Sequence, residues 1–293
     1  MAEKPDITII GPGVVGQVLG LAAFQAGYRI AAVAGGSQTE KAAAFTASVG
    51  GAKVLPAAQA AAAGRLVLLT VKDDAIETVC EQLAAEGGLR HLPLLAHCSG
   101  ALGGEALRAA AAMGCAVGSM HPLQTFPDVE TSLARLPGTY FFLEGDPPAV
   151  EPLEDLARAL GGHPVRIDSQ AKPLYHAAAV LSANYLTTLL DAALRVYESV
   201  GLERSQARQA VAPLLQATLE NALRQGPVEA LTGPIARGDA NIVRRHLQKL
   251  RELQPEIERL YRTLGQATVE LAARKGNLDE PTLQALRNAL AKT

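Results

Sequence analysis

The stretch Ile7-Thr8-Ile9-Ile10-Gly11-Pro12-Gly13-Val14-Val15-Gly16 decides the fold of this chain. Its first four residues are apolar or β-branched and predict a buried strand. Three glycines follow in the spacing Gly-x-Gly-x-x-Gly, and the residues from Val14 to Ala26 predict a helix. A strand, a glycine turn and a helix in this order open a doubly wound α/β sheet.

The glycine turn has the chemistry of a phosphate-binding site. The first glycine allows the tight turn, the second lets the backbone approach a pyrophosphate, and the third permits close packing of helix on strand. Free N–H groups at the start of the helix, together with its dipole, attract the anion. We therefore expect a dinucleotide to bind at Gly11, Pro12, Gly13, Val14, Val15 and Gly16. The alternative is a glycine-rich turn that holds no ligand.

The end of the second predicted strand indicates which dinucleotide binds. An Asp or Glu about 20 residues after the glycines would bond the 2′-hydroxyl of NAD. The sequence there is Ala34-Gly35-Gly36-Ser37-Gln38, which contains no acid. Gly36, Ser37 and Lys41 are the expected contacts, and a serine and a lysine suit a 2′-phosphate, so NADP is favoured and NAD stays possible. Ser37 is also a good N-cap for the helix that follows.

Strands and helices alternate in the first part of the chain. This alternation predicts a Rossmann domain over residues 1–167, with a doubly wound, mostly parallel sheet. The strands are expected at Ile7–Ile10, Tyr28–Val33, Leu66–Thr70, Leu94–Ala96, Ala116–Ser119, Tyr140–Leu143 and Val165–Ile167. Helices are expected at Lys41–Val49, Ala57–Ala63, Asp74–Ala85 and Gly104–Met113.

From Asp168 onward, long Leu/Ala patterns at helical spacing replace the β-branched runs. Residues 168–293 are therefore expected to form an all-α domain that binds substrate and dimerises. Its first helix should run from Leu174 to Val200 without a break, because Gly201 is the first stop signal. Further helices are expected at Arg204–Arg224, Ala240–Leu250 and Pro255–Lys275, with a short one after Asp279.

Composition narrows the partners. The 293 residues exceed the usual size of one core, and 27 basic and 29 acidic side chains give a net charge of −2. This near balance lacks the broad positive field that nucleic acid or an anionic membrane requires. No apolar stretch approaches the roughly 20 residues needed to span a bilayer. Cys80, Cys98 and Cys115 have no paired spacing, which is typical of reduced thiols, so a cytoplasmic location is expected.

Polar loops follow three of the predicted strands. Because the carboxyl ends of parallel strands meet at one edge of the sheet, these loops should line the ligand crevice. Thr70, Val71, Lys72, His97 and Ser99 are expected to contact the cofactor, and His97 and Gln124 the substrate. Histidine titrates near neutrality and can supply the proton that accompanies hydride transfer. His121 is the first choice for that proton donor, and Ser99 is expected to bond substrate or ribose.

The first helix of the second domain also carries candidates. Lys172 and His176 are four residues apart and share one helix face, and Asn184 lies two turns further on. Lys172 and His176 are expected to polarise the substrate or relay protons, and Asn184 to polarise a substrate oxygen. Arg237, in a later Gly/Pro loop, could clamp a substrate carboxylate. A solvated lysine, a capped histidine and a solvated arginine are the alternatives.

A metal site is a less favoured possibility. His97, His121 and His176 could converge beside the cofactor, and neutral imidazole suits zinc or iron. No two of them stand at a metal-ligand spacing, so no metal is expected.

The motifs together resemble a known family. They are the glycine turn, His97-Cys98-Ser99-Gly100, Gly118-Ser119-Met120-His121-Pro122-Leu123-Gln124-Thr125-Phe126, Lys172-x-x-x-His176 and Leu231-Thr232-Gly233-Pro234. This combination resembles oxidoreductases that join a Rossmann-like domain to a helical domain of unknown function. That family is similar to 6-phosphogluconate dehydrogenase, with its characteristic C-terminal domain, and to pyrroline-5-carboxylate reductase, ketopantoate reductase and prephenate dehydrogenase. The resemblance covers essentially the whole chain and implies nicotinamide binding and homodimers built through the helical domain.

Two departures restrict the resemblance. β-Hydroxyacid dehydrogenases place a lysine three or four residues before an asparagine, whereas Tyr175 and His176 stand at that distance from Lys172. The His121-Pro122 pair is similar to that of prephenate dehydrogenases, but Leu123-Gln124-Thr125-Phe126 replaces their glycine-containing continuation. The function expected is hydride transfer to or from a small polar carbonyl, imine or alcohol compound in the cleft between the two predicted domains. A non-catalytic dinucleotide-binding regulator is the alternative.

Overall fold

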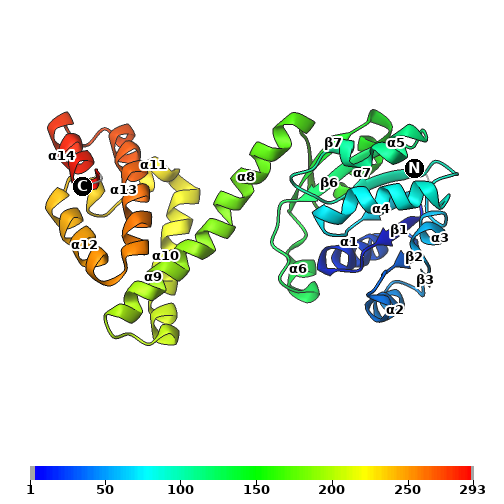
Figure 1. The fold of residues 1–293 in the computed structure, drawn as a ribbon, viewed down its shortest axis with the longest axis horizontal. Coiled ribbons are helices and arrows are strands. Elements are labelled where there is room, and N and C mark those ends of the chain that lie inside the picture. The colour runs from blue at the N-terminus through cyan, green and yellow to red at the C-terminus, as the bar shows by residue number, and fades with distance from the viewer. Residues whose placement is uncertain (1–3, 292–293) are drawn as a thin grey trace. The chain divides into compact units, whose positions relative to one another are not determined.

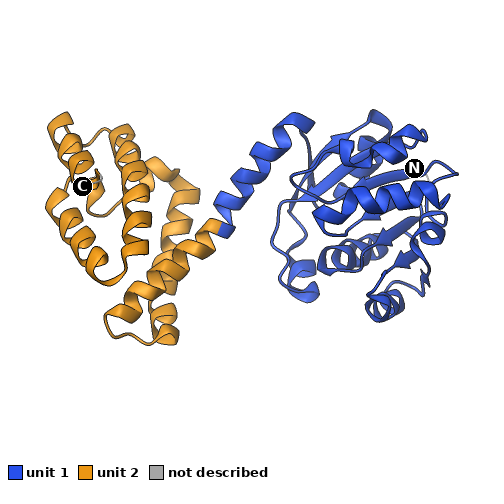
Figure 2. Ribbon diagram, viewed as in Figure 1, with its two compact units in different colours: residues 1–184 blue, residues 185–293 orange. Residues whose placement is uncertain are grey.

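A computed structural model describes residues 4–291 and divides the chain into two compact units. Unit 1 comprises residues 1–184 and unit 2 residues 185–293 (Figure 2). Unit 1 is an α/β domain built on one sheet, and unit 2 is helical (Figure 1). The predicted fold class, a mostly parallel α/β sheet followed by an all-helical region, is confirmed.

The sheet has the order β3-β2-β1-β4-β5-β6-β7-β8. Every neighbouring pair is parallel except β6 and β7, which are antiparallel. The chain runs outward from β1 through β2 to β3 and then returns to place β4 on the other side of β1. The carboxyl ends of β1 and β4 are therefore the topological switch point, where open α/β sheets bind ligands. The strands are β1 (Ile7–Ile10), β2 (Ile30–Ala34), β3 (Lys53–Val54), β4 (Leu66–Leu69), β5 (Leu94–His97), β6 (Val117–Pro122), β7 (Tyr140–Gly145) and β8 (His163–Arg166).

Both faces of the central strands are buried. Leu66 and Leu68 belong to one apolar cluster, whereas Val67 and Leu69 belong to the other. Helices from both sides contribute to these clusters, which explains why the strands are continuous apolar runs rather than alternating ones. The helices of unit 1 are α1 (Val14–Gln25), α2 (Thr39–Ser48), α3 (Ala57–Ala61), α4 (Asp73–Ala85), α5 (Arg108–Ala112), α6 (Val129–Arg135), α7 (Pro147–Ala159) and α8 (Lys172–Ser182), with 3₁₀ turns at Gly104–Leu107 and Ser169–Ala171.

Three elements of unit 1 were not predicted. β3 has only two residues, both exposed, so it lacks the apolar run that identifies a strand. α6 is a short helix whose N-cap, Asp128, accepts a hydrogen bond from the Thr131 amide at 2.8 Å. α7 starts with two prolines and contains Pro152, a composition that suggests a loop, although proline at the first helical positions is well tolerated.

The predicted helix from Leu174 to Val200 is interrupted. α8 ends at Ser182 and α9 (Asn184–Ser199) follows, because Ala183 leaves the helical region with φ −120° and ψ −64°. Neither a glycine nor a proline marks this break. The compact units also divide here, after Asn184, rather than after Ile167. The first turn of α8 belongs with the sheet because Lys172 is bonded to the loop after β5 and to β6.

Unit 2 is built around two apolar clusters. The larger joins α12, α13 and α14 through residues such as Val243, Val269 and Leu286, and the smaller joins α9 and α10 through Leu194 and Val211. The remaining helices are α10 (Arg204–Gln225), α11 (Pro227–Ala230), α12 (Ala240–Leu253), α13 (Pro255–Lys275) and α14 (Glu280–Leu290), with a 3₁₀ turn at Ile235–Arg237. The boundaries predicted for α13 are confirmed, and those for α10 and α12 are confirmed to within three residues.

One helical segment differs from the expectation about apolar stretches. Ser169–Ser199 is long enough and apolar enough to cross a membrane by length and composition, with a mean hydropathy of 1.3 over its best window. Only 11% of that window is buried in the structure. The expectation that no stretch approaches a membrane-spanning length is therefore wrong for this segment.

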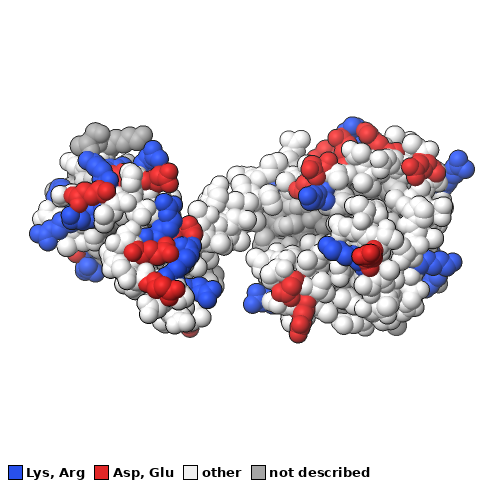
Figure 3. Space-filling view, turned by 60° about the horizontal axis from the view of Figure 1, so that its bottom comes forward, with Lys and Arg blue, Asp and Glu red and all other residues white. Residues whose placement is uncertain are grey.

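Basic and acidic side chains are interspersed over the surface that Figure 3 presents.

Candidate functional site

The glycine turn after β1 shows what each glycine does. Gly11 has φ +102°, and a Cβ there would lie 2.9 Å from the Thr70 carbonyl. A Cβ at Gly16 would lie 2.4 Å from the Gly11 oxygen and 2.5 Å from Thr70 Oγ1. Gly13 is different, because a Cβ there would meet no atom within 4 Å. Two glycines are thus required by packing, whereas the third leaves open space at the start of α1.

That open space fits a pyrophosphate. Gly13 is the N-cap of α1 and no side chain caps the helix, so the first amides of Val14 and Val15 have no side-chain acceptor. No acidic residue lies in the first turn of α1 to repel an anion. The turn also lies at the switch point, since Gly11 N–H donates to Ala34 O at 2.9 Å and Thr70 N–H to Ile10 O at 2.8 Å. The residues present therefore fit a dinucleotide.

The end of β2 presents polar groups and no acid. Gly36 has φ +52°, and Ser37 and Lys41 are both exposed. α2 begins at Thr39 with Gln38 as its N-cap, so Ser37 is not the cap of this helix, and that alternative is wrong. Ser37 keeps its hydroxyl available beside the adenosine end expected for the cofactor.

The loop after β4 is tied to the glycine turn and to the loop after β5. Thr70 Oγ1 donates to Gly11 O at 2.6 Å, and Val71 and Lys72 follow before α4 begins at Asp73. Asp73 Oδ2 accepts a hydrogen bond from Ser99 Oγ at 2.8 Å. These bonds join the carboxyl ends of β1, β4 and β5 into one structure.

His97 lies inside this structure rather than at its surface. The ring is fully buried, with Nε2 2.9 Å from Gly103 O and Nδ1 accepting from the Ser99 amide at 3.2 Å. Both nitrogens are occupied by the loop's own backbone. Burial is the main cause that lowers the pKa of His97 from 6.5 to about 4. This geometry favours a positioning role for His97, since neither nitrogen is free to meet a ligand.

Ser99 is similarly committed. Its hydroxyl donates to Asp73 and accepts from the amides of Ala101 and Leu102, both at 3.1 Å. Its carbonyl accepts from Lys172 Nζ at 3.1 Å. Ser99 thus fixes the turn that presents Gly100, and its hydroxyl proton is already donated to Asp73 at the start of α4.

Lys172 is the most deeply buried charged residue of the site, with 1% of its surface exposed. Besides Ser99 O, its ammonium donates to Ser119 Oγ at 2.6 Å, and Ser119 Oγ donates to Glu144 Oε2 at 3.3 Å. Glu144 also accepts from the Gly104 amide at 2.8 Å. Burial lowers the pKa of Lys172, while nearby carboxylates, Glu144 first among them, raise it. The chain of bonds attaches α8 to β6 and β7.

A second group of polar side chains lies beside this buried lysine. His121 Nδ1 is 2.7 Å from the Tyr175 hydroxyl, and the rings of His121 and His176 meet edge to face with centroids 6.0 Å apart. Gly100 lies against both, because a Cβ there would be 2.6 Å from His176 Nδ1 and 2.9 Å from His121 Nε2. Only glycine therefore fits between the two imidazoles.

Protonation in this group follows from burial. Burial is the largest cause that lowers the pKa of His121 from 6.5 to about 4, and the Lys172 and His176 charges add to it. Burial also raises the pKa of Tyr175. At neutral pH the pair is thus a neutral imidazole bonded to a neutral phenol. His176 Nδ1 is buried and has no hydrogen-bond partner in the structure, and a buried polar atom without one is costly unless a ligand meets it.

A cavity of about 690 Å³ opens beside His121 and His176. Gln124 and Asn184 line it as well, together with apolar side chains such as Phe126 and Phe142. Residues 4–184 contribute no lysine or arginine to its wall. The cavity volume is in the range of small-molecule sites.

Arg237 belongs to unit 2, in the turn before α12. Its Nε donates to Asp239 Oδ2 at 3.1 Å, and 64% of its side chain is exposed. Asp239 holds the N-cap position of α12 without a capping bond because its carboxylate faces this arginine. The described residues contain no group of three metal-ligating side chains arranged around a common point.

The sequence did not single out Tyr175, Ser119, Glu144 or Asp73. Ser119 could have been found by alternation, because it lies two residues before His121 and shares its face of β6. Tyr175 stood three residues after Lys172 on the same helix, but no spacing rule links a tyrosine to a histidine 54 residues away.

Comparisons with known proteins agree with this architecture. Residues 2–122 match the model of a Rossmann-like domain, and residues 139–268 match a domain of unknown function, DUF2520. A search of curated proteins finds no significant match.

Three solved structures illustrate the shared fold. A provisionally assigned NADP oxidoreductase from Bacteroides fragilis is 22% identical over 94% of this chain and 99% of its own, with a TM-score of 0.72. A pyrroline carboxylate reductase from Plasmodium falciparum with NADP bound is 13% identical over 98% and 96%, with a TM-score of 0.58. An imine reductase variant from Myxococcus stipitatus in complex with NAD⁺ is 19% identical over 97% and 99%, with a TM-score of 0.60. The chain therefore consists of a Rossmann-like domain followed by a DUF2520 domain, and it shares the fold of NAD(P)-dependent oxidoreductases.

Proposed function

We propose that the protein is an NAD(P)-dependent oxidoreductase, with NADP favoured, that acts on a small carbonyl, imine or alcohol compound. The observation that carries the proposal is the His121–Tyr175 pair, which lies beside a cavity at the same sheet edge as an open pyrophosphate turn. The fold alone supports dinucleotide binding, whereas this pair supplies groups for proton transfer.

Four side chains beside the cavity have separate roles in the proposed reaction. A bound reduced nicotinamide supplies the hydride. Tyr175 donates its hydroxyl proton to the substrate oxygen or nitrogen, and His121 Nδ1 returns a proton to the phenolate while its Nε2 takes one up. His176 lines the same cavity, and its ring packs edge to face against His121 and orients it. Lys172 holds the loop and the strand that carry these groups, rather than touching the substrate.

The cavity also bears on the substrate. Its wall within residues 4–184 consists of apolar side chains, imidazoles, amides and hydroxyls, without a lysine or arginine. A carboxylate buried against such a wall would have no lysine or arginine partner and would be costly. We propose that the part of the substrate held here is uncharged. Arg237 is already paired with Asp239, which weakens its case as a carboxylate clamp.

The test is NADPH oxidation with a panel of ketones, aldehydes, imines and keto acids. Tyr175→Phe should lower turnover by roughly 10²- to 10⁴-fold and leave the NADPH dissociation constant unchanged, because only the proton donor is lost. Tyr140→Phe is the matched control, since Tyr140 also stacks near a histidine, His163, but is 52% exposed and outside the cavity. Equal turnover of Tyr175→Phe and wild type would contradict the mechanism. NADPH binding without turnover of any compound would instead indicate the regulator alternative.

The cofactor preference has its own test. Ser37 and Lys41 are exposed at the end of β2, and no acid occupies the position that would bond a 2′-hydroxyl. NADPH should therefore bind more tightly than NADH, and Lys41→Glu should reverse or remove the difference. Tighter binding of NADH by the wild type would contradict the preference for NADP.

A further inference from the structure

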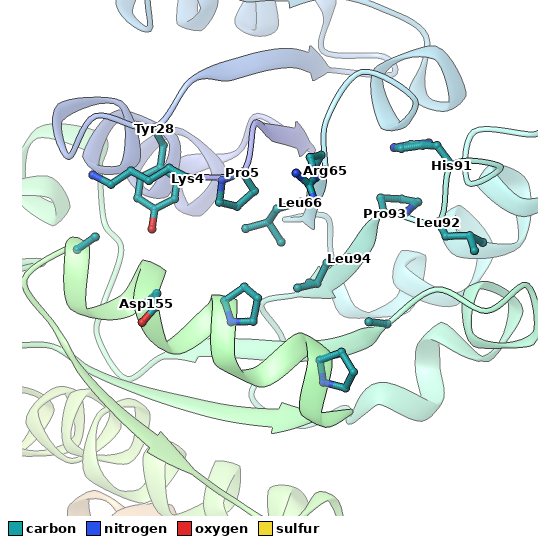
Figure 4. A pocket seen from close by; sticks show the side chains of 14 residues that line it. Lys4, Pro5, Tyr28, Arg65, Leu66, His91, Leu92, Pro93, Leu94 and Asp155 are labelled. Carbon is teal, nitrogen blue, oxygen red and sulfur yellow. The ribbon is translucent and has the colours of Figure 1, made fainter. Parts of the chain in front are cut away.

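A second cavity lies at the opposite edge of the sheet from the glycine turn. It has a volume of about 930 Å³ and is entirely within unit 1 (Figure 4). Leu66 and Leu94, the first residues of β4 and β5, form part of its wall. Both strands run away from it and end at Leu69 and His97 on the dinucleotide edge. The cavity is therefore separate from the site proposed for hydride transfer.

One wall of this cavity is a single face of α7. Pro148, Pro152, Asp155 and Ala159 line it, and their spacing of three or four residues places them in one stripe along the helix. Pro152 lies inside the helix and has no N–H, so the carbonyl of Pro148 cannot form the usual helical bond. Pro5 and Pro93 stiffen other parts of the wall. Rigid prolines reduce the conformational entropy that a ligand would have to freeze.

Most of the polar side chains that line the cavity are basic. Arg65 is exposed and, within the described part of the chain, its guanidinium has no hydrogen-bond or ion-pair partner. His91 is held in place by a 2.9 Å contact between its Nε2 and Gly64 O. Lys4 Nζ lies 5.0 Å from the centre of the Tyr28 ring. Among the described residues of the wall, the one carboxylate is Asp155, which also pairs with Arg158 at 3.4 Å.

The loop between His91 and Pro93 carries unusual backbone geometry. Leu92 has φ +53° and is the non-glycine residue with positive φ in the described chain. Its side chain is 52% exposed although it is apolar, and it lines the cavity. A branched residue in the left-handed region is disfavoured, and such residues concentrate at ligand-binding positions.

We propose that this cavity binds a small organic anion with a compact apolar body, such as an aromatic carboxylate. The Arg65 guanidinium donates hydrogen bonds to the ligand's carboxylate in a charge-assisted pair, and His91 lines the same cavity. Leu94 and the prolines contact the apolar body of the ligand. A wholly apolar ligand would leave the Arg65 guanidinium unused. An inorganic anion would leave most of the apolar wall uncovered.

The probe is phenylacetate, compared with its neutral analogue phenylacetamide by isothermal titration calorimetry on the full chain. Phenylacetate should bind one site per chain, and phenylacetamide should bind about tenfold more weakly or not at all. Arg65→Gln should weaken phenylacetate binding by about tenfold or more, because it removes the charge-assisted pair. Arg90→Gln is the matched control, since Arg90 is exposed two residues before Leu92 but does not line the cavity.

A second variant tests the location. Ala159→Trp fills the cavity from the exposed face of α7 and should abolish phenylacetate binding while leaving the melting temperature near that of the wild type. Saturating NADPH should leave phenylacetate binding in place, because the two sites lie at opposite sheet edges. Equal binding by Arg65→Gln, equal affinity for the neutral analogue, displacement by NADPH, or no binding at millimolar concentrations would each overturn the proposal.

Discussion

Single glycines in the turn after β1 have separable roles, and the structure tells them apart. Gly16 and Gly11 have backbone or side-chain atoms within 3 Å of a hypothetical Cβ, whereas Gly13 has nothing within 4 Å and a φ of −71° that any residue adopts. Sequence spacing alone assigns all three to one motif. Only the three-dimensional structure separates the two glycines that packing requires, Gly11 and Gly16, from Gly13, which leaves space for a ligand.

Gly13→Ala should leave the free energy of unfolding nearly unchanged but weaken NADPH binding by about tenfold or more, because its methyl group occupies the pyrophosphate space. Gly16→Ala should lower the free energy of unfolding by about 1–3 kcal/mol, since its methyl group clashes with Gly11 O and Thr70 Oγ1. Urea unfolding and fluorescence titration with NADPH measure the two effects. Unchanged NADPH affinity in Gly13→Ala would show that the turn does not hold the cofactor.

Two buried histidines make stability depend on pH. The pKa values of His97 and His121 are about 4 in the folded chain and 6.5 in the reference state that represents the unfolded one. Above pH 6.5 both states are neutral and the native state keeps its full stability. As the pH falls from 6.5 toward 4, the unfolded chain takes up protons that the folded chain does not. Each histidine therefore lowers the free energy of unfolding by up to about 1.4 kcal/mol for each pH unit within this window.

The free energy of unfolding should accordingly fall between about pH 6.5 and pH 5, above the range in which most carboxyl groups titrate. His97→Gln removes one of the two groups and should reduce this slope, whatever it does to stability at neutral pH. Urea unfolding across that range gives the slope. An identical slope in the variant would mean that His97 does not stay neutral in the fold.

At the scale of elements, α8 is attached to the sheet by one buried ammonium. Lys172→Met removes the donor to Ser99 O and Ser119 Oγ and should lower the free energy of unfolding by about 1–3 kcal/mol. Lys249→Met is the control, because Lys249 pairs with Glu252 on the surface with 70% of its side chain exposed, and such pairs contribute little. Thermal and urea unfolding compare the two. Equal effects would show that the buried bonds do not hold α8.

The elements also show where sequence reasoning succeeds. The glycine turn and seven of the eight strands follow from local pattern, and a strand buried on both faces, such as β1 or β4, must be a continuous apolar run. The break at Ala183 has no such signature, since alanine favours helix and neither a glycine nor a proline stands there. The same limit applies to the site. Histidines at strand ends are visible in the sequence, but the pairing of His121 with Tyr175, and the burial that makes His97 a loop support, depend on tertiary packing.

At the scale of the whole molecule, the apolar surface of the helices calls for a partner. Within unit 2, Leu189 on α9 and Leu214 and Leu223 on α10 are 43%, 61% and 78% exposed. Exposed apolar side chains in this number mark an interaction surface. The segment Ser169–Ser199 is also apolar enough to span a bilayer by composition, so its partner is either protein or lipid. We propose a second copy of the chain, because exposed apolar side chains also lie on α10, which is not part of that segment.

Light scattering after gel filtration should therefore give a mass near twice 30.5 kDa in detergent-free buffer. Leu219→Glu combined with Leu223→Glu should shift the protein toward monomer, since burying two carboxylates in an apolar interface is costly. Leu253→Glu is the control, an exposed leucine at the end of α12, and should leave the mass unchanged. A wild-type monomer that sediments with lipid vesicles would replace the second copy with a membrane, and a monomer that ignores vesicles would leave dimerisation contradicted.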